Sequence, residues 1–226
     1  MRPMEISDEL EAHGYALVRG LLGEARCAEL RASFDDDALF RNTVVMERHG
    51  YGRGVYRYFG YPLPPLVADL RERTYAQLAP VANAWADAFG EPARYPAVLA
   101  DFLARCHAEG QTRPTPLMLR YRGGDHNALH RDLYGDIAFP LQATVLLSEP
   151  GAAFEGGEFV LVEQRPRKQS LAHVVPLRLG DAVVFPNAIR PVRGGRGFFR
   201  TAFRHGVAEV RRGERLTLGL IYHDAR

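Results

Sequence analysis

The chain has 226 residues, of which 46% are hydrophobic, so it is long and apolar enough to bury a substantial core and is neither disordered nor fibrous. Its 29 basic and 27 acidic residues leave a net charge of only +2. So mild a balance does not indicate a surface specialised for nucleic acid or anionic membrane.

The N-terminal stretch carries acidic residues, among them Glu5, Asp8 and Glu9, where a secretory signal needs an unbroken apolar run. No segment approaches the roughly 18 to 20 apolar residues of a membrane span. Cys27 and Cys106 lie far apart without a C-x-x-C spacing, which is typical of reduced thiols. We therefore expect a soluble cytoplasmic protein with no membrane partner; the sequence leaves its oligomeric state open.

Elements of mostly helical character occupy the first half of the chain. Residues 14–22 predict a strand that leads into a first helix. Apolar residues then recur at three- and four-residue intervals over 24–34, 64–89 and 96–110, which predicts three amphipathic helices. The stretch 41–64 is rich in Gly, Arg and Tyr and has little periodicity, so it predicts a long loop or hairpin that either covers a site mouth or is simply solvated.

The character of the chain changes near residue 115. Short runs rich in Val, Leu, Phe and Thr follow, separated by Gly, Pro and Asp. They predict strands over 116–121, 129–134, 141–149, 156–164, 172–179, 181–187, 197–210 and 215–224. Strands at this spacing are typical of a sandwich, jelly roll or barrel. We expect a single domain over 1–226, with a helical support region at 1–115 and a catalytic β-core at 116–226.

The triplet His130-Arg131-Asp132 is the first candidate for a functional site. In an extended segment side chains alternate, so His130 and Asp132 project to the same side. This pair makes half of a metal site, although such triplets also occur by chance on surfaces and in cores. His126 and His130 have the spacing of a helical zinc pair, but the glycines just before them argue against a helix, and no H-E-x-x-H glutamate is present.

Three later histidines are candidates for the missing ligand. His173 opens a predicted strand and His223 lies near the end of the chain; we expect both to be hydrogen-bonded or exposed. His205 differs because Arg215 follows it ten residues later, and Thr217 lies one strand repeat beyond. The second half of the metal site is therefore assigned to His205.

The order of these motifs resembles a known family. H-x-D, then "FEGGEF" at 154–159, "GDAVVF" at 180–185 and a distal "HGVAEVRRGERLT" are similar to the iron(II)- and 2-oxoglutarate-dependent dioxygenases, especially their prolyl-hydroxylase-like branch. The resemblance covers roughly residues 116–224. More narrowly, "YRGGDHNALHRDLYGD" together with the distal segment is similar to bacterial oxygenases that are sometimes associated with oxidative repair of alkylated DNA.

The resemblance implies a double-stranded β-helix, or jelly roll, flanked by α-helices, and a bound Fe(II). Two histidines and one carboxylate on one face of an iron form the facial triad of non-haem oxygenases, which leaves positions open for cosubstrate and O₂. His130, Asp132 and His205 are the implied metal ligands and catalytic residues. The implied reaction converts 2-oxoglutarate and O₂ into succinate and CO₂ while it oxidises a substrate C–H bond.

The resemblance also implies a cosubstrate pocket. The planar fork of Arg215 matches the far carboxylate of 2-oxoglutarate, and Thr217, on the same face of the same strand, adds a hydroxyl donor. Tyr121 resembles the tyrosine that often lies beside the cosubstrate in this branch. The alternatives are that Arg215 is a surface arginine at a strand start and that Tyr121 is a packed aromatic.

Three functions follow for comparison. The first is a hydroxylase that acts on a small molecule or a peptide. The second is a demethylase of alkylated nucleic-acid bases, which we expect less because the charges are nearly balanced and the arginine-rich segments are scattered. Dealkylases of that kind typically carry a second arginine six positions after the first, and here that position is Ile221. The third is a metal-binding, cupin-like domain without oxygenase activity, which has no need of Arg215 and Thr217.

Overall fold

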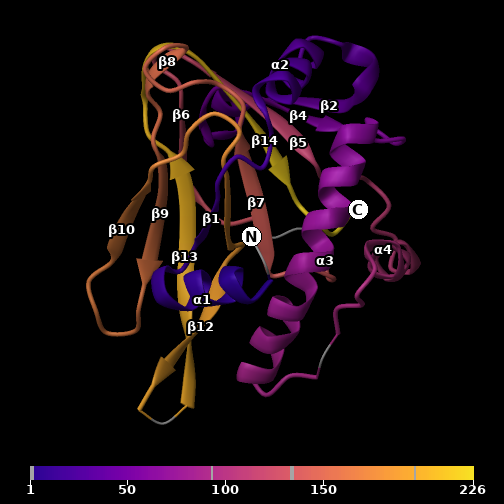
Figure 1. Ribbon diagram of the computed structural model, residues 1–226, viewed down its shortest axis with the longest axis vertical. Helices are drawn as coiled ribbons and strands as arrows, with labels where there is room; N and C mark the ends of the chain where they lie inside the picture. Colours follow the sequence, from indigo (N-terminus) through magenta and orange to yellow (C-terminus); the bar gives the residue numbers. More distant parts are fainter. Residues whose placement is uncertain (1–2, 93, 133–134, 196) are drawn as a thin grey trace.

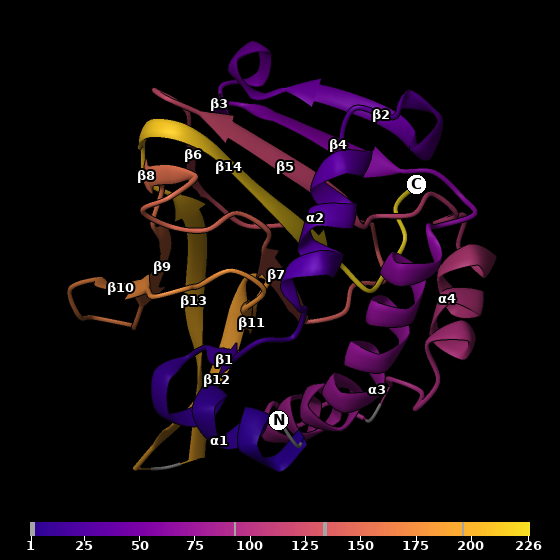
Figure 2. The ribbon, with the colours of Figure 1, turned by 45° about the horizontal axis from the view of Figure 1, so that its top comes forward.

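Two antiparallel sheets face each other and four α-helices lie along one side of them in the computed structural model (Figures 1 and 2). The structure describes residues 3–92, 94–132, 135–195 and 197–226. Sheet-on-sheet packing with helices outside is the jelly-roll arrangement expected from the sequence. None of the described helices has the length and apolar character needed to span a membrane.

The helices pack their apolar stripes against the outer face of the larger sheet. They are α1 (Pro3–His13), α2 (Glu24–Ser33), α3 (Pro65–Ala88) and α4 (Leu99–Ala108), and two short 3₁₀ helices are η1 (Asp37–Leu39) and η2 (Met46–His49). The last three α-helices confirm the three predicted ones. Helix α1 was not predicted, because its five charged residues and short length obscure the stripe formed by Ile6 and Leu10. Trp85 of α3 is a core residue, as expected.

The larger sheet, sheet A, has the order β1-β11-β7-β14-β5-β4-β2, with β8 paired to β14. Its strands are β1 (Ala16–Val18), β2 (Phe40–Val45), β4 (Val55–Phe59), β5 (Leu117–Arg122), β7 (Leu141–Leu146), β8 (Phe154–Gly156), β11 (Ala182–Pro186) and β14 (Val210–Leu220). The smaller sheet B has the order β10-β9-β13-β6-β3, with β12 paired to β13. Its strands are β3 (Gly52–Arg53), β6 (His126–His130), β9 (Phe159–Gln164), β10 (Leu171–Val175), β12 (Ile189–Gly194) and β13 (Gly197–Val207).

Alternation along the strands of sheet A separates two cores. On β14, Leu216, Leu218 and Leu220 face the helices. The residues between them, Arg215 and Thr217, therefore face sheet B. The interior of the sandwich is a second apolar cluster, to which both sheets contribute. Both faces of the central strands are thus buried, which explains their nearly continuous apolar runs.

The boundary expected at residue 115 does not separate helices from strands. Residues 40–59 form β2, β3 and β4, and β4 pairs with β5 in register, so the predicted loop or hairpin extends both sheets. In the second half β8 and β12 were not predicted. The strand expected over 129–134 is instead β6, which ends at His130; residues 133 and 134 lie outside the described residues.

Candidate metal and cosubstrate site

Two neighbouring strands of sheet B bring His130 and His205 together. The two residues are direct partners in the pairing of β6 with β13, and their ring centroids lie 4.2 Å apart. Asp132 lies two residues beyond the end of β6, with Oδ2 at 3.2 Å from Nε2 of His205 and Oδ1 at 3.6 Å from Nε2 of His130. The expected reason for the convergence was therefore wrong in part: Asp132 reaches the site from a loop and not by strand alternation.

One ligand atom from each of these three residues lies within 4.8 Å of the others, and the described residues contain no second such cluster. Nδ1 of His130 lies 2.8 Å from the carbonyl oxygen of Ala128. If Nδ1 carries the proton and donates it there, Nε2 keeps its lone pair and points toward Asp132. The backbone of β6 thus orients one imidazole for metal binding.

The electrostatics keep the donor set in its ligating form. Burial opposes ionisation of Asp132, but the neighbouring His205 and His130 outweigh it and hold the pKa of the carboxyl below its usual range, with help from the amide of Gln142. Burial, and after it the nearby His205, lowers the pKa of His130. A carboxylate beside neutral imidazoles is the donor set that suits Fe(II).

Arg215 lies in the same interior and is almost completely buried. Its guanidinium is 5.7 Å from the ring centroid of Tyr121 and 5.9 Å from that of Phe154. Within the described part of the chain, Nε and Nη1 of Arg215 have no hydrogen-bond partner. Burial lowers the pKa of Arg215 to about 10, so the side chain stays cationic at neutral pH. A buried cation with free donors is costly unless an anion joins it.

Three residues around Arg215 shape its surroundings. Thr217 is buried on the same face of β14. Tyr121, on the adjacent strand β5, pairs in register with Arg215, and its hydroxyl accepts a hydrogen bond from Nδ2 of Asn127 at 3.2 Å. Gly157 has a φ of +62°, and a Cβ there would lie 2.9 Å from Cδ of Arg215. The glycine pair expected to form a turn or bulge also makes room for this cation.

A cavity of about 380 Å³ connects the metal cluster with Arg215. The inner face of sheet A supplies most of its wall: Tyr56, Tyr58, Leu117, Leu119, Gln142, Thr144, Thr217 and Ile221. The sequence analysis missed Gln142 and Thr144. Their signal was present, because "LQATVLL" places two polar residues two apart in an apolar strand, where they share one face.

The rim of this cavity comes from the segment that follows β2. Tyr51 and Leu129 line the opening and are 50% and 47% exposed, and the exposed side chain of Arg131 lies beside them. The amide of Ala128 donates a hydrogen bond to the carbonyl oxygen of Tyr51 at 2.9 Å, which joins the rim to the metal-bearing strand. Of the two interpretations of residues 53–62, the structure supports the one that covers the site, through Tyr56 and Tyr58.

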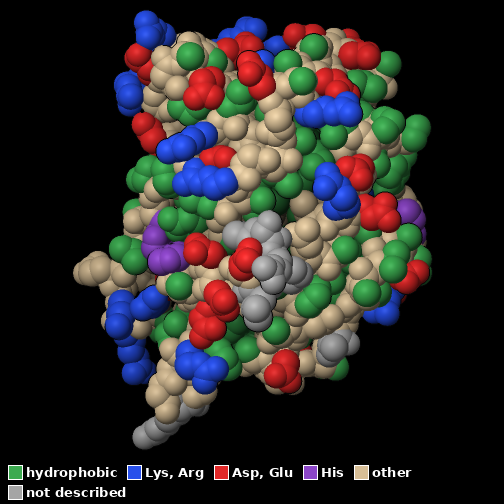
Figure 3. Space-filling model, viewed as in Figure 1, with side chains coloured by type: hydrophobic (Ala, Val, Ile, Leu, Met, Phe, Trp, Pro, Cys, Tyr) green, Lys and Arg blue, Asp and Glu red, His purple; other side chains and the backbone are tan. Residues whose placement is uncertain are grey.

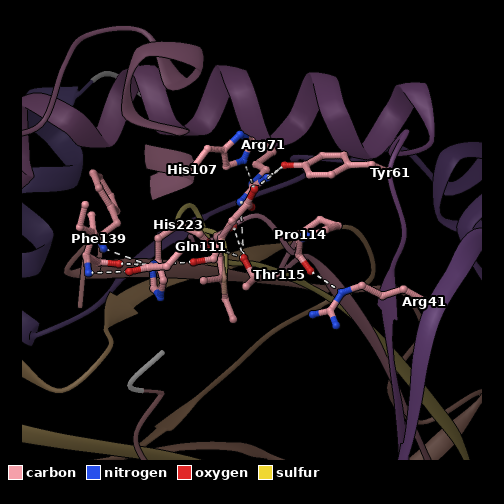
Figure 4. Close-up of polar contacts among 12 residues, drawn as sticks. Arg41, Tyr61, Arg71, His107, Gln111, Pro114, Thr115, Phe139 and His223 are labelled. Atoms are coloured by element: carbon pink, nitrogen blue, oxygen red, sulfur yellow. Dashed lines mark hydrogen bonds and ion pairs between the residues drawn. The ribbon is translucent and has the colours of Figure 1, made fainter. Parts of the chain in front are cut away.

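A polar cluster anchors the loop that carries Asp132 (Figure 4). Oε1 of Gln111 accepts hydrogen bonds from the amides of Asp136 and Ile137 at 2.9 and 2.8 Å, and Nε2 donates to the carbonyl oxygens of Ile137 and Asp224. Asp224 is itself buried and forms an ion pair with Arg71 of α3 at 2.8 Å. The loop after the metal ligand is thereby attached to the helical layer.

The two remaining candidate histidines lie outside the metal cluster. His223 is fully buried, and its Nδ1 accepts a hydrogen bond from the amide of Phe139 at 3.2 Å. His173 is half-buried on β10, with Nε2 at 3.7 Å from Oε2 of Glu163. Both outcomes agree with a structural role, and His205 is the histidine that joins His130 and Asp132.

Comparison with solved structures defines the fold. A prolyl-4-hydroxylase from Pseudomonas putida superposes with a TM-score of 0.58 over 99% of both chains at 19% identity. An oxidoreductase of the 2-oxoglutarate-Fe(II) oxygenase family from Burkholderia pseudomallei gives a TM-score of 0.59 over 98% of this chain and 89% of the other at 16% identity. Fold and site together define an oxygenase built on the scaffold of the iron(II)- and 2-oxoglutarate-dependent enzymes.

Sequence comparison identifies the family. Residues 54–225 match the Oxygenase-NA model, described as an oxygenase catalysing oxidative methylation of damaged DNA, and the chain belongs to this family. The uncharacterized protein Rv2227 of Mycobacterium tuberculosis (strain H37Rv) is 48% identical over 167 residues, which cover 74% of this chain and 72% of that protein. The uncharacterized protein MT2286 of strain CDC 1551 matches with the same figures.

Proposed function

We propose that the protein is an iron(II)- and 2-oxoglutarate-dependent dioxygenase in which His130, Asp132 and His205 hold the metal and Arg215 holds the cosubstrate. The observation that carries this proposal is the buried guanidinium of Arg215, whose free donors face the same cavity as the metal cluster. A dicarboxylate that chelates the metal at one end and pairs with Arg215 at the other would satisfy both ends of this cavity.

The chain's own residues divide the work. The hydroxyl of Thr217 lies on the same face as Arg215 and supplies a further donor to the carboxylate. The stacked position of Tyr121 beneath Arg215 fixes the guanidinium plane. When bound, iron and 2-oxoglutarate supply O₂ activation for C–H oxidation, with release of succinate and CO₂. A cupin-like domain without oxygenase activity would need neither Arg215 nor Thr217, and membership of an oxygenase family argues against it.

Substrate class is the second part of the proposal. The sequence analysis favoured a small molecule or peptide because the charge is nearly balanced, and acidic and basic side chains are indeed interspersed over the face in Figure 3. The family description names damaged DNA instead. Tyr56 and Tyr58 line the cavity, and their rings meet edge to face at 5.5 Å. An aromatic wall of this kind favours a flat ring, so we propose an alkylated base as the substrate group.

Anaerobic titration tests the proposal directly. The protein is loaded with Fe(II) and titrated with 2-oxoglutarate, and the metal-to-ligand absorption band is recorded. We expect the band in the parent protein and its loss in Asp132→Ala and His205→Ala, whereas His173→Ala should keep it. Loss of the band in His173→Ala with retention in His205→Ala would contradict the choice of the distal ligand.

Succinate release then identifies the substrate. The loaded enzyme is supplied with O₂ and, in turn, with free amino acids, peptides and N-methylated oligonucleotides. We expect methylated oligonucleotides to stimulate succinate release and to lose the methyl group. Stimulation by a peptide alone would restore the peptide hydroxylase as the preferred function.

A further inference from the structure

We propose that Tyr51, stacked on His49 and flanked by Arg131, forms a platform for the nucleotide next to the oxidised base, so that the enzyme selects single-stranded over duplex nucleic acid. This inference rests on the proposed function, in which an alkylated base enters the cavity. It assigns a role to the rim of the cavity, which the reaction itself does not use.

The depth of the site is the first step of the argument. Asp132 and His205 are 8% and 7% exposed, so the reactive position lies beneath the rim. A base paired and stacked in a duplex cannot reach a buried centre and must leave the helix first. The neighbouring base then loses one stacking partner, and an aromatic side chain at the opening can replace it.

Tyr51 has the properties that such a replacement requires. Its side chain is half exposed at the opening, although tyrosines of this size are usually more buried. The His49 ring lies 5.4 Å away and nearly parallel, at 21°, which supports one face of Tyr51. Because Tyr51 is bonded through its carbonyl oxygen to Ala128, two residues before His130, the platform is held at a fixed place relative to the metal.

The charge at the rim matches a phosphate. Arg131 follows His130 directly, lines the cavity and is exposed. It forms no ion pair with any residue in the described ranges, whereas many other exposed arginines, such as Arg73 with Asp69, are paired. Leu129 adds exposed apolar surface between the cation and the platform. An aromatic ring, an apolar patch and one free cation are the groups that bind a single strand without reading its sequence.

The test measures binding without turnover. The protein is loaded with Mn(II) and 2-oxoglutarate under anaerobic conditions and titrated into a fluorescently labelled short strand that carries one N-methylated adenine, alone or annealed to its complement. We expect the single strand to bind at least about ten-fold more tightly than the duplex. Tyr51→Ala should weaken single-strand binding by roughly ten-fold, while Tyr51→Phe keeps it.

Arg131 is tested through salt. For single strands log K falls by about 0.7 per unit of log salt for each phosphate contacted, so Arg131→Ala should reduce the slope by about that amount. The matched control is Arg73→Ala on helix α3, which should change neither affinity nor slope. Equal affinity in Tyr51→Ala and the parent, or preference for duplex, overturns the inference.

The proposed function is checked separately on the same preparations. A parent protein that forms the iron and 2-oxoglutarate absorption band but binds neither strand, or whose succinate release responds only to peptides, overturns the platform and leaves the dioxygenase assignment standing. A parent protein without that band overturns the dioxygenase assignment, whatever the strand binding shows.

Discussion

Arg215 carries a positive charge into the interior of the sandwich, where no described acidic group pairs with it. The folded protein therefore holds an unfavourable charge until a carboxylate arrives. Stability and ligand binding make opposite demands on this one side chain, as they often do at functional sites. The two demands can be separated by replacing the guanidinium with an apolar group of similar length.

Arg215→Met should weaken 2-oxoglutarate binding by roughly ten- to a hundred-fold, the loss expected for one charge-assisted contact. In the ligand-free protein the same change should raise the free energy of unfolding by roughly 1–4 kcal/mol, because a buried charge is replaced by an apolar chain. Denaturant unfolding with and without 2-oxoglutarate measures both effects. Arg212→Ala is the control on the same strand, since its surface ion pair with Glu155 is remote from the cavity. A less stable Arg215→Met protein would show that the charge is already compensated.

At the scale of elements, the loop after Asp132 depends on one glutamine. All four hydrogen-bonding positions of the Gln111 amide are used by backbone groups, so the side chain joins the 136–137 segment to the C-terminal segment. Gly135 fits this arrangement, because with its φ of +70° a Cβ would lie 2.4 Å from Cδ of Gln111. The metal ligand is therefore positioned by contacts made after it in the chain.

Gln111→Leu should lower stability by about 1–3 kcal/mol, since it leaves buried backbone groups without partners. Iron affinity should fall as well, because the loop that carries Asp132 is no longer fixed. Thermal unfolding and anaerobic Fe(II) titration report the two effects independently. Gln164→Leu is the control, since Gln164 also bonds backbone carbonyls but lies in the exposed turn after β9. Unchanged iron affinity in a destabilised Gln111→Leu protein would reduce Gln111 to a purely structural residue.

The sequence predicted the elements whose pattern is local. Three amphipathic helices and most strands of the jelly roll follow from periodicity, and His130, Asp132, His205 and Arg215 follow from motif order. What it missed depends on distant partners. Strand β4 exists because it pairs with β5, some sixty residues later, and β12 because it pairs with β13 across a glycine-rich turn. The cavity wall from Tyr56 and Tyr58 was out of reach for the same reason.

For the molecule as a whole, acid stability is set partly by a histidine that cannot be hydrated. Burial, and after it the nearby Arg71, lowers the pKa of His223 to about 4. Between that value and the ordinary value of about 6.5, the unfolded chain binds a proton that the folded chain does not. Stability therefore falls as the pH drops through this interval.

We expect the free energy of unfolding to decrease by roughly 3 kcal/mol from His223 between pH 7 and pH 4, at 1.36 kcal/mol for each pKa unit. His223→Gln has no titrating group there and should lose less stability over the same range, although it starts lower because the hydrogen bond from Phe139 is altered. Urea unfolding at a series of pH values, without metal, compares the two. Parallel pH profiles would assign the acid sensitivity to other groups.

The attachment of β6 to its sheet is sparse. Only His130 and Asn127 are in register with β13, at His205 and Val207, and an irregularity lies between the two pairs; β3 adds two further positions on the other edge. An ion shared by His130 and His205 would act as a rivet through this seam, and the rim that hangs from β6 would stiffen with it. Loading of iron and readiness for the substrate are then one mechanical event, and an enzyme depleted of metal would lose its shape at the doorway before it lost its fold.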